Sequence, residues 1–165
     1  MEKEINQDSD QFDIENSYNN LKKNYILPDF NALTEDFDIE KIQDKETIFL
    51  AREIRRIINE KITAYIHLFE TLINPTQPPM FVFKILKGIS IKEKEQIQEF
   101  YNILSKTQLQ IMKLDTVYSE KAEVEFINEN FKTWQKTKTK IYRLFEILEE
   151  NFENGNTEKE RSYFD

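Results

Sequence analysis

The residues of this chain best suited to chemistry are cationic, and they fall into two groups. The planar guanidinium group of arginine suits phosphate and carboxylate partners, so a cluster of arginines could contact a phosphate backbone. Alternatively, an arginine stem at the edge of an apolar helix face can pack there while its charge pairs with an acid of residues 1–47. The first group holds three of the chain's five arginines within five residues: Arg52, Arg55 and Arg56.

The second group lies between residues 132 and 143. Its members fall within about 80° of one another on a helical wheel, opposite the apolar residues of the same stretch. A solvated helix face accounts for such a stripe, and so does a surface for an acidic partner or a phosphate backbone. We call Lys132, Lys136, Lys140 and Arg143 the basic stripe.

Lys138 stands apart from this stripe, because it interrupts the apolar heptad positions of the same helix. An ammonium group there is costly unless it is paired or reaches water. We interpret Lys138 either as an irregularity in the core or as part of a working surface.

Other polar residues offer little for catalysis or metal binding. His67 is the only histidine and cysteine is absent, so the usual zinc sites and a thiol nucleophile are excluded. The acids Asp36, Asp38 and Glu40 alternate with apolar residues and lack the glycine of a calcium loop, so we expect an acidic–apolar strip that docks its apolar side. Phosphate-binding glycine loops and nucleophile elbows are missing. The sequence therefore predicts a non-enzymatic protein with no catalytic, cofactor-binding or metal-binding residues.

Composition favours helices. Two glycines and four prolines in 165 residues are too few for the turns of a β-sandwich or an α/β domain. The net charge of −8 is unevenly spread: residues 1–47 carry 13 acids and 5 bases, whereas residues 48–150 carry 14 acids and 16 bases. No apolar run is long enough to span a bilayer and no signal-peptide pattern is present, so we expect a cytoplasmic protein without a membrane partner.

Apolar periodicity predicts three long helices, at 45–73, 90–114 and 120–152, the third capped by Ser119. Asn74-Pro75 should end the first, a capping box at Ser90 should begin the second, and Asn154-Gly155 should end the third. A short apolar helix, 80–87 with Gly88 as its cap, should cover one end. The predicted fold is all-α: an antiparallel bundle of three long helices plus a short apolar helix and an acidic N-terminal arm.

The predicted organisation has three parts. Residues 1–20 are expected to be a disordered acidic arm, residues 21–153 a single helical bundle domain, and residues 154–165 a flexible tail. Between residues 21 and 44, spaced apolar side chains should be at least partly buried on the bundle. These are Leu27, Phe30, Leu33, Phe37 and Ile39.

The function predicted from these features is a non-catalytic protein–protein interaction module, a helical adaptor or complex subunit that binds another protein or its own copy and needs no cofactor. The alternative is a nucleic-acid- or ribosome-associated protein that uses the arginine group and the basic stripe. We also expect the acidic arm to shield one of these basic groups. The candidate interaction residues are Arg52, Arg55, Arg56, Lys132, Lys136, Lys138, Lys140 and Arg143.

Overall fold

The computed structural model describes residues 13–42 and 49–161, with side chains as far as Asn154. The described residues are helical throughout their regular structure and contain no strand, which confirms the all-α prediction. None of these helices is long and apolar enough to cross a membrane. The elements are α1 (Ile14–Asn24), α2 (Phe30–Phe37), the 3-10 helix η1 (Ile39–Lys41), α3 (Leu50–Ile73), α4 (Met80–Gly88), α5 (Ile91–Thr116) and α6 (Glu120–Arg161).

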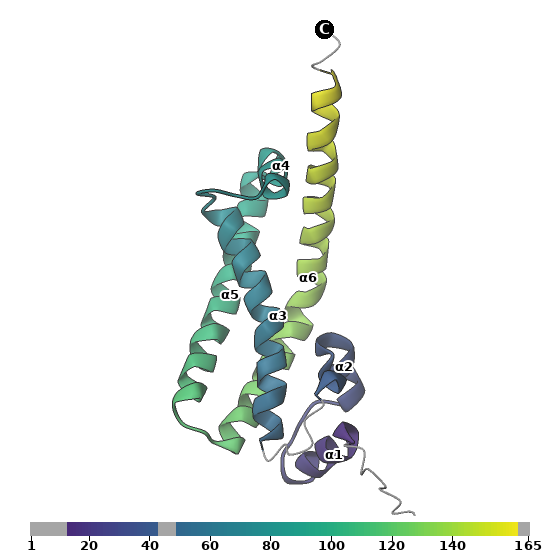
Figure 1. Cartoon of the computed structure of the whole chain (residues 1–165), viewed down its shortest axis with the longest axis vertical. Coiled ribbons are helices and arrows are strands. Elements are labelled where there is room, and N and C mark those ends of the chain that lie inside the picture. The colour runs from purple at the N-terminus through teal and green to yellow at the C-terminus, as the bar shows by residue number, and fades with distance from the viewer. Residues whose placement is uncertain (1–12, 43–48, 162–165) are drawn as a thin grey trace, which may run out of the picture.

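Three long helices lie side by side: α3 and α6 run in the same direction, and α5 runs the opposite way (Figure 1). Their apolar stripes face one another, and each fully buried aliphatic or aromatic side chain contributes about 1.5–3 kcal/mol of hydrophobic free energy. The most deeply buried members of this core are Ile54, Ile58, Phe69, Ile97, Phe100, Ile127 and Leu144.

Most helix ends lie where the capping residues predicted them. The Ser90 hydroxyl accepts from the Glu93 backbone N–H at 3.3 Å, and the Glu93 carboxylate accepts from the Ser90 N–H at 2.7 Å, so the capping box begins α5. Asn74 caps the end of α3. The predicted end of α6 at Asn154-Gly155 is wrong, because the helix continues through Gly155 to Arg161. With 42 residues, α6 is roughly 63 Å long.

The short helix α4 packs against α6 at one end of the long helices (Figure 1). Val82 and Ile85 are buried, whereas the opposite side of α4 remains exposed. Gly88 is the last residue of α4 and does not have a positive φ angle, so it is not the left-handed cap that the sequence suggested. A Cβ atom at this position would lie 2.7 Å from Asn151 Oδ1 of α6, and close approach of the two helices therefore explains the glycine.

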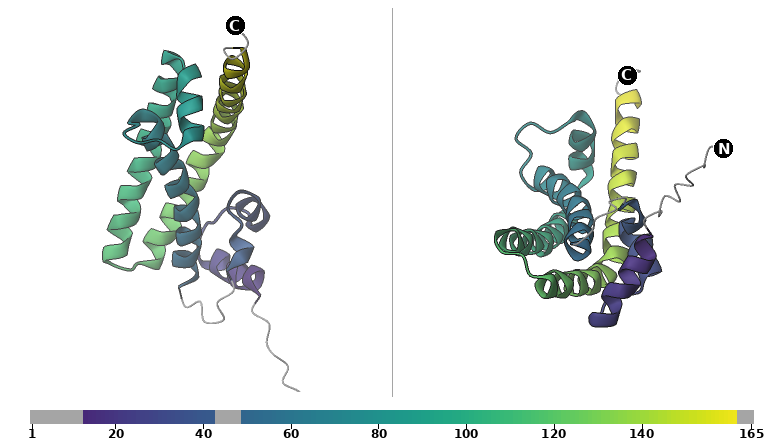
Figure 2. Two further views of the ribbon diagram at one scale, coloured as in Figure 1. Left: turned by 45° about the horizontal axis from the view of Figure 1, so that its top comes forward. Right: turned by 60° about the horizontal axis from the view of Figure 1, so that its bottom comes forward.

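The N-terminal arm is more ordered than predicted. Residues 14–20 belong to α1, so the predicted boundary of a disordered arm at residue 20 is wrong; residues 1–12 lie outside the described part. Tyr18 is fully buried and its hydroxyl donates to the Pro28 carbonyl at 2.9 Å. Both α1 and α2 lie against α3 and α6 on the side away from α5 (Figure 2). The predicted burial of Leu27, Phe30, Leu33, Phe37 and Ile39 is confirmed.

Tyr18 should dominate the stability of the arm. We expect Tyr18→Ala to lower the free energy of unfolding by about 3–5 kcal/mol, as for other buried aromatic side chains. Tyr18→Phe removes only the hydrogen bond to Pro28 and should cost about 1 kcal/mol. Urea unfolding monitored by circular dichroism measures both values. Tyr142→Phe, at an exposed position, is the control and should change stability by less than about 0.5 kcal/mol.

Candidate functional site

The three arginines of α3 occupy three different environments. Arg56 is exposed and pairs with Glu53, one turn earlier, at 2.7 Å. Arg52 is partly exposed, and its guanidinium carbon lies 4.5 Å from the centre of the Tyr118 ring and 5.3 Å from that of Phe49. Arg55, in contrast, is buried. The sequence group is therefore not one continuous cationic surface.

Arg55 forms the centre of a buried ion-pair cluster. Its Nε donates to Glu123 Oε2 and its Nη2 donates to Asp115 Oδ1, both at 2.6 Å. Arg55 is 1% exposed and Glu123 is 0% exposed. Since a dissolved ligand cannot reach either group, the cluster is a structural joint between α3, the end of α5 and the start of α6. Among the described residues, the acid partners of these arginines lie in the long helices and not in the N-terminal arm, as had been expected; residues 1–12 and 43–48 lie outside the described part.

Removing one partner of the Arg55–Glu123 pair should destabilise the protein far more than removing both. Glu123→Leu leaves the buried Arg55 charge with less compensation and should lower the free energy of unfolding by about 3 kcal/mol. In the double variant Arg55→Met/Glu123→Leu, most of that loss should be recovered because no buried charge is left.

Chemical unfolding of the two single variants and the double variant gives the comparison. The matched control is Arg56→Met, which removes an exposed arginine and should cost less than about 0.5 kcal/mol. If the double variant lost as much free energy of unfolding as the two single variants together, that result would contradict a cluster of paired, mutually compensating charges.

Lys138 joins the arm to α6. Its ammonium group lies 3.0 and 3.1 Å from the two carboxylate oxygens of Asp36 in α2. Gln135 also donates to this carboxylate. Lys138 is thus paired, and 40% of its side chain remains exposed. Lys138→Leu should weaken the docking of the arm instead of stabilising the helix.

Lys61 of α3 completes this junction. Its ammonium group lies 4.8 Å from the centre of the Trp134 ring and 5.4 Å from that of Phe37, and it donates to the Asp36 carbonyl. Burial lowers the pKa of Lys61, although Asp36 and Asp38 act in the opposite direction. Partial burial acts to raise the pKa of Asp36, but hydrogen bonds from Lys138 and Gln135 and the Lys138 charge outweigh it, so this pKa lies below its ordinary value.

Acid should therefore loosen the arm through Asp36. Because its pKa in the folded protein is lowered, its stabilisation is complete above the ordinary Asp pKa of about 3.9 and is lost as the pH falls through the lower folded value. We expect Asp36→Asn to lower the free energy of unfolding by about 1–2 kcal/mol at pH 7. Urea unfolding at pH 7, 5 and 3 should show this difference shrinking at pH 3.

The control is Glu35→Gln, which removes a neighbouring exposed carboxylate and should have little effect at any pH. If the difference in free energy of unfolding between Asp36→Asn and the wild type grew as the pH fell, the stabilising role of the ionised Asp36 would be contradicted.

The basic stripe lies on the open face of α6. All four of its side chains are exposed, and none makes an ion pair with another described residue. Asp36 of the arm pairs with Lys138 and not with a residue of the stripe. Shielding of the stripe by the described part of the arm is thus not observed, and residues 1–12 and 43–48 lie outside the described residues.

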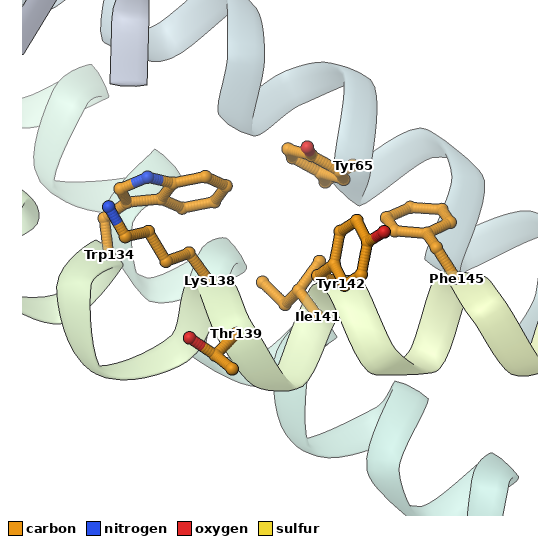
Figure 3. A pocket seen from close by; sticks show the side chains of 7 residues that line it. All are labelled: Tyr65, Trp134, Lys138, Thr139, Ile141, Tyr142 and Phe145. Atoms are coloured by element: carbon orange, nitrogen blue, oxygen red, sulfur yellow. The ribbon is translucent and has the colours of Figure 1, made fainter. Parts of the chain in front are cut away.

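On another side of α6, an open groove of about 400 Å³ lies between α3 and α6. Figure 3 shows Trp134 and Lys138 at one end and Tyr65, Tyr142 and Phe145 at the other. The Tyr65 ring lies 5.8 Å from Trp134 and 5.7 Å from Phe145, centre to centre, and forms part of the groove's aromatic wall. Thr139 also lines the groove. No residue of the basic stripe lines this groove, which is formed on the apolar side of α6.

The remaining candidates do not form a reactive site. His67 is exposed on α3. Asp38 takes the left-handed conformation at the end of α2 and pairs with Lys41 at 2.9 Å, while Phe37 and Ile39 are buried, as the acidic–apolar strip predicted. Among the described residues, no group of three or more His, Asp or Glu side chains is arranged to hold a metal ion.

Sequence reasoning missed Glu123 and Asp115 as partners of Arg55. A signal for Glu123 was present, because it shares one helix face with Ile127, Asn130 and Trp134 at spacings of four, three and four residues. An acid on such a face requires a partner. Asn130 follows the same rule: it is buried and accepts a hydrogen bond from the Thr107 hydroxyl at 2.9 Å.

Comparison of the chain with protein-family models, with curated proteins and with solved structures gives no match in any of the three.

Proposed function

We propose that this protein is a non-catalytic interaction module, a small antiparallel helical bundle with an acidic N-terminal arm, and that it binds another protein through the outer face of α4. The observation that carries this proposal is the concentration of large exposed apolar side chains on a short helix. Met80 is 68% exposed, Phe81 50% and Phe83 51%.

The fold leaves half or more of each of these side chains exposed. The inner side of α4, with Val82 and Ile85, already packs against the rest of the protein. Methionine and aromatic residues are enriched in protein interfaces and supply much of the binding free energy when they become buried there. Exposing three of them together is unfavourable in a chain that has no partner for them.

Charge indicates the chemistry of the partner. Residues 71–92 contain no Asp or Glu, although the chain has 31 acids, and they contain the three lysines Lys84, Lys87 and Lys92. The surface that fits this face is therefore an apolar patch rimmed by acidic side chains. Two copies of α4 face to face would bring like charges together, which favours a different protein as the partner.

The test is affinity purification from the source cells, followed by direct binding of each recovered protein in purified form. We expect the triple variant Met80→Ser/Phe81→Ser/Phe83→Ser to lose a partner that the wild type retains. Since all three positions are exposed, its melting temperature should remain within a few degrees of the wild type.

The matched control is Leu109→Ser/Met112→Ser, which removes exposed apolar side chains from α5 and should retain the partner. Analytical ultracentrifugation of the wild type and the triple variant addresses self-association. A dimer that the triple variant abolishes would identify a second copy as the occupant and contradict the heterologous partner. Equal recovery of every protein by the wild type and the triple variant would refute the role of α4.

A further inference from the structure

A small pocket lies at the end of the bundle where α3 ends and α5 begins, beside α4 (Figure 1). Its volume is about 180 Å³. A cavity of about 150 Å³ admits benzene, so this pocket has the size of one phenyl or branched aliphatic side chain. We call it the end pocket; among the residues that line it are Leu72, Ile73, Leu86, Lys94, Ile97 and Gln98.

Exposed apolar side chains surround the end pocket. Ile73 lines it and is 38% exposed. Ile91 is 78% exposed and lies one turn before Lys94 on the same side of α5, because residues three apart share a helix face. By the same spacing, the exposed Phe83 lies one turn before Leu86 on α4. The pocket therefore continues the exposed apolar face of α4 onto α3 and α5.

The charged group at the end pocket is a cation. Lys94 lines the pocket, is exposed, and has no ion-pair partner among the described residues. Gln98, one turn later on α5, adds a neutral amide, and no Asp or Glu of the described residues lines the pocket. A group that enters the pocket thus meets apolar surface inside and a positive charge beside it, to which a carboxylate is the complement.

We infer that the end pocket is the anchor site of the α4 interface, and that it takes a leucine-sized or phenylalanine-sized side chain of a partner protein whose neighbouring carboxylate pairs with Lys94. The anchor is buried against Leu72, Leu86 and Ile97. This inference rests on the proposed function, because it places an anchor at the same end of the protein. It does not use the three side chains changed in the triple variant, so each proposal can fail separately.

The shape of this surface favours a protein segment over a membrane. Exposed apolar side chains and lysines also suit an anionic bilayer, which receives side chains that protrude from a protein. The end pocket is concave instead, and it is filled by a side chain that a partner projects into it. At protein interfaces, anchors that fill such pockets contribute much of the binding free energy.

A short peptide tests the anchor site directly. The probe is the acetylated and amidated peptide EELEE, which carries one leucine between carboxylates. It is titrated into the isotope-labelled full-length protein, and binding is followed by NMR of the backbone amides. We expect saturable shifts of the signals of Lys94, Ile97 and Gln98. The control peptides EESEE, without the apolar anchor, and QQLQQ, without charge, should each bind about threefold more weakly or worse.

Variants of the full chain locate the site. Gln98→Trp places a large ring at an exposed position beside the end pocket and should weaken EELEE binding about fivefold or more by filling it. The matched control Asn102→Trp, one turn later and also exposed, should leave binding unchanged. Lys94→Gln should weaken binding about two- to fivefold. Lys106→Gln, which removes another exposed lysine of α5 and gives the same net charge, should not.

Three results would overturn the inference. The first is no shift of these signals with EELEE at millimolar concentration. The second is binding that Gln98→Trp leaves intact, because the peptide would then lie elsewhere. The third is cosedimentation with phosphatidylserine vesicles that Lys94→Gln abolishes, without binding of EELEE, which would assign this end of the protein to a membrane.

The outcomes for α4 and for the end pocket are distinguishable. Loss of a partner by the triple variant, without binding of EELEE to the wild type, would leave the α4 proposal standing and refute the end pocket. Binding of EELEE that Gln98→Trp weakens, with every partner retained by the triple variant, would support the end pocket and refute the role of α4.

Discussion

The buried contact between Arg55 and Glu123 determines how the three long helices meet. Apolar helix faces can slide past one another by a turn, about 5.4 Å, and still bury much of their surface. A buried guanidinium and a buried carboxylate do not tolerate such a shift, because separation leaves two uncompensated charges in the interior at a cost of several kcal/mol. Asp115 adds the end of α5 to the same joint. The cluster therefore selects one register among several that hydrophobic burial alone would allow.

That register brings together the aromatic residues at the contact between α3 and α6. Tyr65 follows Arg55 by ten residues along α3, and Trp134 follows Glu123 by eleven along α6, which are distances of roughly 15 and 16 Å. Because α3 and α6 run in the same direction, the ion pair and the Tyr65–Trp134 contact require the same alignment. The position that receives Phe37 and the groove beyond it are thus consequences of a charged joint at the other end of the helices.

Local sequence signals were sufficient to place the three long helices, but not for α1, the end of α6 or the contacts between the elements. The capping box at Ser90, the stop at Asn74 and the apolar spacing of residues 27–39 act within a few residues, and the structure confirms them. Tyr18 was missed because its neighbours are polar and its burial depends on α1 packing against the rest of the arm. Lys138 and Arg55 were identified as unusual, but their partners lie 102 and 68 residues away, and helical periodicity carries no information about such pairings. The exposed face of α4 was missed for the same reason: an apolar segment is predicted to be buried when it is not known which other helices can cover it.

The distribution of charge in the fold also changes what the net charge of −8 implies. A protein this acidic would be expected to repel acidic partners if its charges acted together. At physiological salt, however, exposed charges interact over about 8 Å, so a ligand responds to the side chains next to it. Asp36, Asp115 and Glu123 are engaged with Lys138 and Arg55, whereas the basic stripe has no counterpart among the described residues. Among the described residues, the fold uses these acids to position helices and leaves the cations of the basic stripe exposed on the outer side of α6. Local recognition of acidic segments is therefore compatible with an acidic chain.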